Sequence, residues 1–417
     1  MLSRLFARNS LNVLGINSGT SIDGLDLALV KVSRTKSGEL RVKPLLKRAA
    51  HYPASVRKAL LHLADSAKVA PEELALLDEA LGDLIGEAAR SFIASAKRKD
   101  LRTETIASHG QTIRHHPLKV SRLGRNICAT LQIGAPERIA SQTGLPVVSN
   151  FRQADTALGG EGAPITTSAV YHVLHSSRKS RLVINIGGIA NIFYIKKGGP
   201  LSLMEARDVG PGNVLLDLAA QELFSADYDR GGKLAASGAV SLRLLSLMSG
   251  GGFFKGAETR STGRERYTPA SLRKILKLAR DLELSAEDIL ASLVELSASK
   301  IISAAERIAG GDKHLKEVYL SGGGLKNRQL VRRIRAGLPS LKVYSIKKLG
   351  YHPDFFESVC YAILGYCCLH GLEAIQPASS RGAGIGQKSN IRVSAPILGR
   401  ISQPPKLIHH GTLARNR

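Results

Sequence analysis

The sequence is poor in cysteine, methionine and aromatic residues, lacks tryptophan, and has too few acidic residues to balance its basic ones. Its 417 residues include 34 acidic and 59 basic side chains, which gives a formal net charge of +25. No apolar run approaches the ~20 residues that cross a bilayer, so we expect no membrane helix and predict a cytoplasmic location. Residues 1–22 contain no acidic side chain, and we interpret them as an irregular N-terminus rather than a targeting signal.

The four cysteines fit neither a metal-binding spacing nor a disulfide framework, and we interpret them as small core residues in a reducing compartment. The basic residues are scattered along the chain without zinc-finger spacing, an aromatic–basic RNA signature or basic-zipper heptads. We therefore expect a solvated basic surface that attracts anionic substrates. A dedicated nucleic-acid-binding role is the less favoured alternative.

Two strand–glycine–strand units organise the chain. The first joins strands at 12–16 and 25–32, and the second joins strands at 182–186 and 192–195. Helical periodicity follows each unit, as in 72–99, so we predict two related α/β lobes with a cleft between them. The expected division is an N-terminal lobe at 11–150 completed by part of 375–400, a C-terminal lobe at 151–370, and a basic, disordered tail at 403–417.

Three glycine-rich loops at strand ends favour nucleotide binding. A triphosphate needs close backbone N–H groups, hydroxyls and a carboxylate for its metal ion, and segment 17–24 offers all three. Hairpin tips carry the same residue types for turn reasons, and no Walker sequence follows. Gly187 and Gly188 end a buried strand, and 321–324 separates a strand from a helix. Together the three loops indicate a nucleotide site more strongly than any one of them.

Asp208 precedes a Gly-Pro-Gly turn that opens into a helix at 214–223. A carboxylate held in this way can act as a general base, although an Asp often only caps a turn. The segments 108–112 and 151–164 are rich in hydrogen-bonding side chains and suit a hydroxylated substrate. Segment 261–265 adds a cation, Arg264, that could bind phosphate or form a surface salt bridge.

The order of seven motifs resembles the anhydro-N-acetylmuramic acid kinase family. The motifs lie at 18–24, 108–112, 160–164, 185–191, 208–213, 261–265 and 322–327, and the resemblance extends from about residue 12 to about residue 366. That family belongs to the superfamily of sugar kinases, actin and heat-shock ATPases. The resemblance therefore implies an α/β protein with two ribonuclease-H-like (actin-like ATPase) lobes around a central ATP/substrate cleft, with ATP and Mg²⁺ as cofactors.

The resemblance also implies a paired hydrolysis and phosphorylation of an anhydro sugar. Asp208 would deprotonate a water that attacks the anomeric carbon of 1,6-anhydro-N-acetylmuramic acid, and the released O6 would take the γ-phosphoryl group of ATP. The family's ATP-binding positions match Gly19, Thr20, Ser21, Ile22, Asp23, Gly24, Leu25, Asp26, Gly187, Gly188, Asn191, Gly322, Gly323, Gly324 and Asn327, with Asp23 as the metal ligand. Its substrate-binding positions match His109, Gln111, Arg152, Asp155, Glu161 and Glu357.

Three positions depart from the family pattern. Asn150 stands where Asp is usual, Glu161 where Gln is usual, and Arg207 where an aromatic residue is common. These departures leave open a related levoglucosan-type kinase as a second hypothesis. A catalytically weak ATP-binding protein with a basic, partner-binding surface is the third. The resemblance allows a homodimer.

Overall fold

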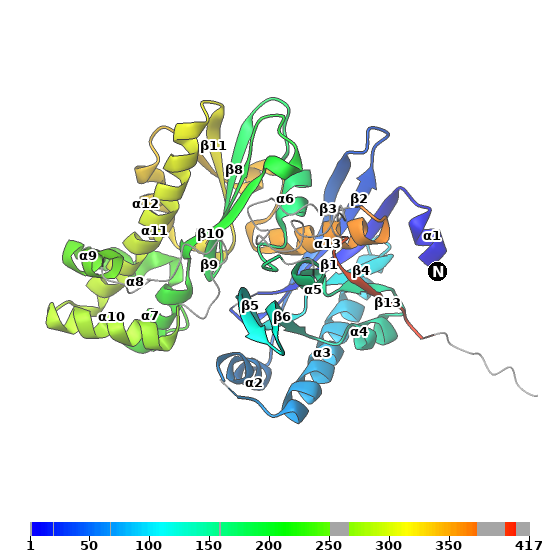
Figure 1. The fold of residues 1–417 in the computed structure, drawn as a ribbon, viewed down its shortest axis with the longest axis horizontal. Coiled ribbons are helices and arrows are strands. Elements are labelled where there is room, and N and C mark those ends of the chain that lie inside the picture. The colour runs from blue at the N-terminus through cyan, green and yellow to red at the C-terminus, as the bar shows by residue number, and fades with distance from the viewer. Residues whose placement is uncertain are drawn as a thin grey trace, which may run out of the picture.

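Two β-sheets lie on either side of helix α13 (Phe356–Leu369) and divide the chain into two lobes (Figure 1). The computed structural model describes residues 2–19, 21–66, 68–157, 160–250, 267–372 and 397–405. No helix within these ranges is long and apolar enough to cross a membrane. Segment 261–265, the residue Thr20 and most of 375–400 and 403–417 lie outside the described residues.

The first lobe contains a six-stranded sheet in the order β13-β7-β4-β1-β2-β3. β1 pairs antiparallel with β2 and β2 with β3, whereas β1–β4 and β4–β7 are parallel pairs. β13 adds an antiparallel strand from far along the chain at the edge of β7. The strands are β1 (Ser10–Ser18), β2 (Gly24–Arg34), β3 (Leu40–His51), β4 (Thr105–Ser108), β7 (Val147–Ser149) and β13 (Arg400–Ser402).

The second lobe repeats this arrangement in a five-stranded sheet ordered β10-β9-β8-β11-β12. Its first three strands are antiparallel neighbours, and β8–β11 and β11–β12 are parallel. Both lobes therefore have the strand order and directions of a ribonuclease-H-like sheet, which confirms the predicted fold class. The strands are β8 (Ser180–Ile186), β9 (Ile189–Ile195), β10 (Glu205–Pro211), β11 (Leu315–Ser321) and β12 (Lys342–Ser345).

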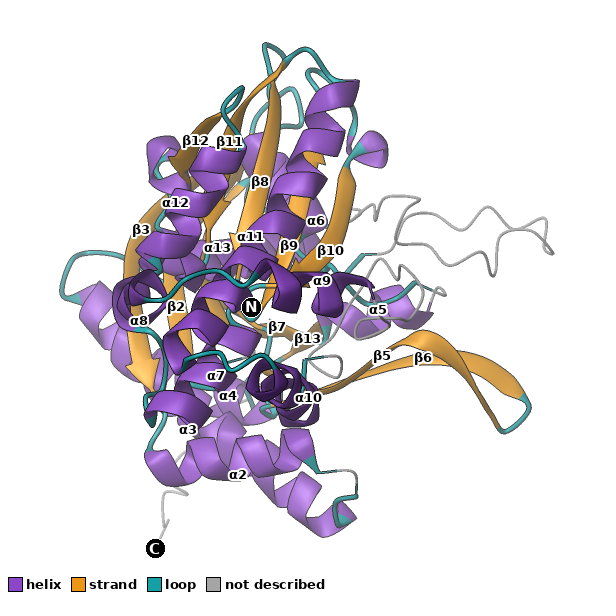
Figure 2. Ribbon diagram, turned by 90° about the vertical axis from the view of Figure 1, so that its left-hand side faces the viewer, coloured by secondary structure: helices purple, strands orange, loops and turns teal. Residues whose placement is uncertain are grey.

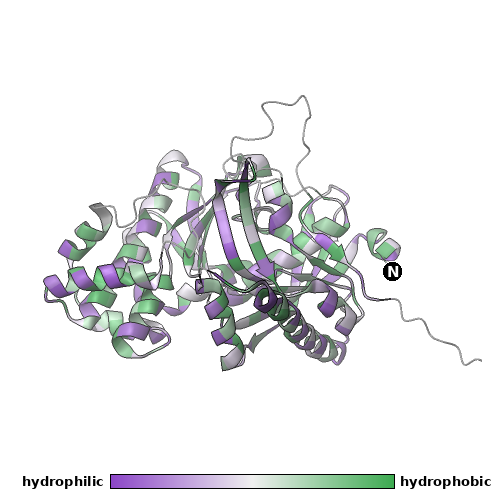
Figure 3. Ribbon diagram, turned by 60° about the horizontal axis from the view of Figure 1, so that its bottom comes forward, coloured by the Kyte–Doolittle hydropathy of each residue, from purple (hydrophilic) through white to green (hydrophobic). Residues whose placement is uncertain are grey.

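Amphipathic helices cover the sheets, and their ribbons carry alternating hydrophilic and hydrophobic residues (Figure 3). The predicted helix at 72–99 is α3, and the Ser285 side chain caps α11 by accepting from the Asp288 amide, as its sequence predicts. The helices of the first lobe and the connection are α1 (Leu2–Phe6), α2 (Ala54–Asp65), α3 (Pro71–Lys97), α4 (Pro136–Thr143), α5 (Phe151–Ala157) and α6 (Thr167–Leu174). Those of the second lobe are α7 (Val214–Phe224), α8 (Lys233–Ser237), α9 (Leu242–Gly250), α10 (Pro269–Asp281), α11 (Ala286–Gly311) and α12 (Arg328–Gly337).

Helix α13 follows the second sheet in the chain but packs on the first one. A Cβ on Gly15 of β1 would overlap the Ser358 carbonyl oxygen, and a Cβ on Gly365 would contact Ala107 of β4. Only glycines allow this close approach of helix and strands. The same apolar cluster also contains Val183 and Tyr319 from the second sheet, so one core joins the lobes. The domain boundaries at 150 and 370 stay predictions.

A two-stranded ribbon, β5 (Gln111–Arg122) with β6 (Arg125–Ile133), projects from the first lobe (Figure 2). The sequence analysis did not predict it. Short 3₁₀ turns complete the connections at η1 (Leu201–Leu203), η2 (Arg230–Gly232), η4 (Gly323–Lys326), η5 (Ile346–Leu349) and η6 (Pro353–Phe355).

Candidate nucleotide and substrate site

A row of polar side chains crosses the second sheet. Asp208 of β10 lies opposite Asn191 of β9, Asn191 lies opposite Asn185 of β8, and Asn185 lies opposite Ser321 of β11. Residues directly opposite each other point to the same face of a sheet. The Asn191 amide donates to the Asp208 carboxylate, and the Ser321 hydroxyl donates to Asn185 Oδ1 at 3.0 Å. The row therefore holds the Asp208 carboxylate in a fixed orientation.

Glu357, in the first turn of α13, connects this row to the first lobe. Its carboxylate accepts from Asn185 Nδ2 at 3.3 Å and from Asn17 Nδ2 of β1 at 3.0 Å. Burial raises the pKa of Glu357, and the nearby Arg152 guanidinium and the Asn17 hydrogen bond oppose that rise. The carboxylate is the point at which strands of both lobes meet.

The first lobe has its own cross-strand pair at this junction, because Asn17 lies opposite Asp26 of β2. Burial, followed by the nearby carboxylates of Asp23, Glu357 and Asp354, raises the pKa of Asp26 to about 7. Several carboxylates thus share a small region next to the first glycine loop. Such a region favours a cation, which would lower their mutual repulsion.

The first glycine loop lies between β1 and β2. Ile22 has a φ of 53° and a side chain that is 1% exposed, which anchors the loop, while Ser21 donates to the exposed Asp23 at 2.7 Å. At the base of the loop, the Ser18 hydroxyl donates to Gln111 Oε1 at 2.5 Å and lies 2.9 Å from the Tyr52 hydroxyl. The loop is therefore joined to the 108–112 segment.

The second glycine loop is held by backbone hydrogen bonds. Gly212 N and Val214 N donate to Gly188 O, and Asn213 N donates to Gly187 O, at 2.8 to 3.1 Å. The register of β10 against β9 shifts between Asp208 and Gly210, which is a β-bulge. The turn that follows Asp208 thus fixes the tip of the β8–β9 hairpin.

The third glycine loop follows β11. Gly322 has a φ of 85°, and a Cβ there would overlap the Ile186 carbonyl oxygen, so this loop lies directly against the second one. The Asn327 side chain accepts from Leu330 N at 3.0 Å and caps α12. Gly232, which no sequence motif predicted as part of the site, packs against Asn327.

Arg152 links the substrate-side residues. Its Nε donates to His109 Nε2 at 2.9 Å and its Nη1 donates to Gly162 O at 2.7 Å. Burial, and then the Arg152 charge, holds the pKa of His109 well below its ordinary value of 6.5, so the ring is neutral with its proton on Nδ1. Asp155 accepts from Gly162 N at 2.8 Å and shapes the segment that carries the half-buried Glu161.

The structure thus brings the first and third glycine loops, Gln111, Arg152 and Glu357 to the junction of the lobes through the hydrogen bonds given above. Arg207 precedes Asp208 in β10 without an intervening bulge, so it points to the opposite face of the sheet. It pairs in register with Ile192, a core residue. Arg207 therefore lies on the face of the second sheet opposite the one that carries Asp208.

Asn17 and Asn185 stand inside predicted motifs, but the sequence predicted no individual role for either residue. Both stand in the same tetrapeptide pattern, Ile-Asn-x-Gly, at 16–19 and 184–187. That repeat was a usable signal, because it marks equivalent positions at the ends of the first strand of each sheet.

A divalent cation fits the first loop. The described residues contain no cluster of three or more His, Cys, Asp or Glu side chains arranged for a metal ion. Mg²⁺ does not require such a cluster, because in nucleotide sites it is held by one or two carboxylates, water and phosphate oxygens. Asp23 and Asp26 supply that number of carboxylates.

Two ribonuclease-H-like sheets that meet at a polar junction define an actin-like, two-lobed ATPase architecture of the kind used by sugar kinases. Residues 11–390 match the family model described as "Anhydro-N-acetylmuramic acid kinase". The chain belongs to this family.

Curated relatives agree with this assignment. The chain is 37% identical to an anhydro-N-acetylmuramic acid kinase from Cyanothece sp., over 88% of this chain and 96% of the relative. It is 36% identical to the enzyme of that name from Pseudomonas putida, over 89% and 96%. Kinase chemistry with ATP follows from family membership.

Solved structures resemble the chain more distantly. One is an activator of 2-hydroxyisocaproyl-CoA dehydratase from Clostridium difficile with bound ADPNP, at 13% identity and a TM-score of 0.41, covering 87% of this chain and 96% of that one. Another is a ROK family glucokinase from Streptomyces griseus, at 11% identity and a TM-score of 0.36, covering 84% and 97%.

Proposed function

We propose that the protein uses ATP and Mg²⁺ to convert 1,6-anhydro-N-acetylmuramic acid into N-acetylmuramate 6-phosphate. The observation that carries this proposal is the polar row from Asp208 to Asn185 with Glu357 at its end. Neighbouring strands lie ~4.8 Å apart, so Asp208 lies about 10 Å from Asn185, two strands away. In this proposal the sugar ring and the attacking water lie against this face of the sheet, between Asp208 and Glu357.

In this proposal, Asp208 removes a proton from a water that attacks the anomeric carbon. The bond from that carbon to the bridging oxygen breaks, and the bridging oxygen becomes O6 of the open sugar. O6 attacks the γ-phosphorus of ATP, and ADP leaves. The proton on Asp208 returns to solvent, so the sum is sugar, water and ATP in, and sugar 6-phosphate, ADP and one proton out. Attack from the face opposite the leaving oxygen is the inverting arrangement.

The other residues hold the reactants. The loops at 17–24 and 322–324 offer backbone N–H groups to the phosphates, and Asp23 with Asp26 would hold Mg²⁺, which neutralises phosphate charge. Asn191 keeps the Asp208 carboxylate turned toward the junction. Arg152, His109, Gln111, Asp155, Glu161 and Glu357 form the sugar side. The cytoplasmic location remains part of the proposal, and light scattering during gel filtration tests the homodimer that the family resemblance allows.

The test is ATP consumption by purified protein with and without the anhydro sugar, for the native chain and Asp208→Asn. A general base contributes ~10²–10⁴-fold, so we expect Asp208→Asn to lose about that factor in kcat. Asp281→Asn, an exposed Asp at the end of α10, is the matched control and should be fully active. Proton NMR early in the reaction should show the anomer whose hydroxyl is opposite the lost bridge. Full activity of Asp208→Asn, or no sugar-stimulated turnover, would contradict the proposal.

A further inference from the structure

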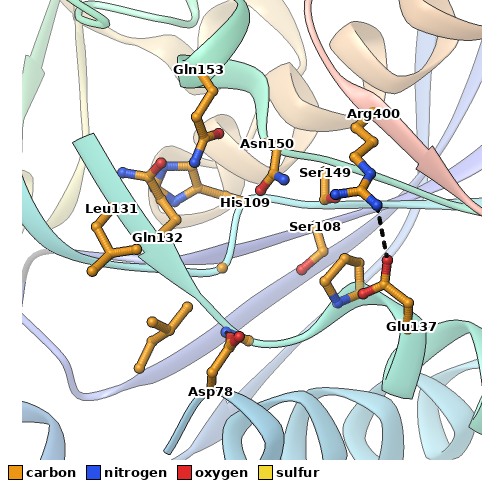
Figure 4. Close-up of a pocket in the computed structure, with 14 residues that line it drawn as sticks. Asp78, Ser108, His109, Leu131, Gln132, Glu137, Ser149, Asn150, Gln153 and Arg400 are labelled. Atoms are coloured by element: carbon orange, nitrogen blue, oxygen red, sulfur yellow. Dashed lines mark hydrogen bonds and ion pairs between the residues drawn. The ribbon is translucent and has the colours of Figure 1, made fainter. Parts of the chain in front are cut away.

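A polar pocket of about 270 Å³ lies in the first lobe at the carboxyl ends of β4 and β7 (Figure 4). Its lining comes from seven elements and the turns beside them. The polar side chains that line it include Ser108, His109, Gln132, Ser149, Asn150 and Gln153. Among these, only His109 belongs to the expected substrate-binding set.

Two buried serine hydroxyls in this pocket have no hydrogen-bond partner among the described residues. Ser108 and Ser149 are 1% and 5% exposed, and their Oγ atoms have no hydrogen-bond partner among the residues that the structure describes. β4 and β7 pair in parallel through Ala107 and Val148, so these two serines are neighbours at adjacent strand ends. Buried polar groups without partners are rare and cost ~1–3 kcal/mol each. A pair of them facing one pocket indicates a polar occupant.

The charges of the pocket favour an occupant that offers acceptor oxygens. His109 is neutral and carries its proton on Nδ1, because Nε2 accepts from Arg152. Asp78 accepts from Gly134 N at 2.6 Å, and Glu137 is paired with Arg400 and accepts from Ser402 at 2.8 Å. Both acidic groups are thus already engaged. The serine hydroxyls and the Asn150 amide remain as donors, and Gln132 Oε1 and Gln153 Oε1 are buried acceptors without a partner among the described residues.

The pocket lies within reach of the proposed sugar position. His109 N donates to Ile16 O at 3.0 Å, next to Asn17, which contacts Glu357. β4 is adjacent to β1, one strand spacing of ~4.8 Å away. A substituent that extends from a sugar ring near Glu357 spans that distance. His109, which lines the pocket, accepts from Arg152, one of the residues expected to bind the sugar.

We propose that this pocket is a specificity subsite that binds an acceptor-bearing substituent of the sugar, either an acetamide or a carboxylate. This inference rests on the proposed function, because it assumes that the sugar lies at the lobe junction. Ser108, Ser149 and Asn150 are specificity residues in it and take no part in the bond-breaking steps. The pocket separates decorated anhydro sugars from a bare one such as levoglucosan.

Steady-state kinetics with three sugars test the subsite. 1,6-Anhydro-N-acetylmuramic acid has both substituents, 1,6-anhydro-N-acetylglucosamine has only the acetamide, and levoglucosan has neither. We expect Ser108→Ala and Ser149→Ala each to raise the KM of a decorated sugar about tenfold, the effect of one lost hydrogen bond. The kcat, the KM for ATP and the KM for levoglucosan should not change. The sugars that respond identify the occupant, because loss of a serine hydroxyl should weaken only the carboxylate-bearing sugar if the pocket holds the carboxylate, and both decorated sugars alike if it holds the acetamide.

Ser168→Ala is the matched control. Ser168 is 2% exposed and its Oγ also has no partner among the described residues, but it lies in α6 and does not line the pocket. Equal KM changes for all three sugars, or changes no larger than those of Ser168→Ala, would overturn the subsite. Absence of turnover by the native protein with every sugar would instead contradict the proposed function. Titration calorimetry of the sugars without ATP would then test the pocket separately. If the native protein and Ser149→Ala bind the decorated sugars with equal affinity, the pocket is not a subsite.

Discussion

The two lobes have the same strand order but place their carboxylates on different strands. At the junction, the first lobe aligns Ala49, Asp26 and Asn17 across β3, β2 and β1. The second lobe aligns Asp208 and Asn191 with Asn185 across β10, β9 and β8. The carboxylate is therefore on the second strand in one lobe and on the third strand in the other. The repeated sheet provides equivalent positions in the two lobes, and the residue type at each position determines the chemistry there.

The loops of the two hairpins differ as well. The β8–β9 tip makes backbone hydrogen bonds to the 212–214 turn. At the β1–β2 tip, the exposed Asp23 side chain accepts from the nearby Ser21, and its backbone carbonyl accepts from Tyr52 N at 3.1 Å. A fixed tip suits the side that orients a general base. An exposed carboxylate on the other tip suits a metal-bound nucleotide that arrives from solvent.

Glu357→Leu removes the link between the lobes and should have the largest effect on stability. The Asn17 and Asn185 amides would lose their acceptor, and each partly buried amide without a partner costs ~1–3 kcal/mol. We expect the free energy of unfolding to fall by about 3 kcal/mol in urea denaturation. Glu357→Gln keeps one acceptor oxygen and should lose less. An unchanged urea midpoint for Glu357→Leu would show that the lobes do not depend on this contact.

Asp26→Asn makes the first lobe resemble the second, in which Asn191 occupies the equivalent position. Because the pKa of Asp26 is raised from 3.8 to about 7, the folded state binds more protons than the unfolded state between these pH values. The stability of the native protein should therefore fall as pH rises from about 4 to about 7, by about 2 kcal/mol because solvent screens this partly exposed group. The Asn variant should lack this contribution and be the more stable protein at pH 8. Melting curves of the native protein and the Asn variant at pH 5 and pH 8 measure this difference. If the stability of both proteins changes equally with pH, the raised pKa of Asp26 is refuted.

Gly212→Ala and Gly19→Ala compare the two tips directly. A Cβ on residue 212 would overlap the Gly187 carbonyl oxygen, whereas the nearest atom to a Cβ on residue 19 is Ser21 Oγ at 3.8 Å. We expect Gly212→Ala to lower the free energy of unfolding by ~1–3 kcal/mol, because the β8–β9 tip must shift. Gly19→Ala should change stability by less than ~0.5 kcal/mol. Similar costs in thermal unfolding would mean that the tips are equally constrained.

Tyr52→Phe should have a smaller effect than Gly212→Ala. It removes the hydroxyl that lies 2.9 Å from Ser18 at the base of the first loop. The lost hydrogen bond should weaken ATP binding by ~0.5–1.5 kcal/mol, and steady-state kinetics would show this as a modest rise in the KM for ATP. Tyr228→Phe is the control, since that side chain is 49% exposed. If both variants bind ATP like the native protein, Tyr52 does not position the loop.

The sequence predicted local features well and long-range ones poorly. Glycine loops, hairpins and the capped helices α11 and α12 follow from patterns a few residues long. The Glu357 contacts join residues 340 and 172 positions apart, and no local pattern specifies such a pair. The placement of α13 on the first sheet was equally hidden, because its apolar residues indicate burial without indicating the sheet they cover. Likewise, the Ser108–Ser149 pair depends on which strands become neighbours.

The packing of α13 has a consequence for how the chain can be divided. Residues Val359, Ala362, Ile363 and Tyr366 join the cluster that also contains Val13 and Ala107 of the first sheet. A fragment that ended at residue 150 would expose that apolar surface to water, and a fragment that began at 151 would carry a helix without its partner. Neither half is an autonomous folding unit. The protein should therefore unfold in one cooperative transition despite its two similar sheets.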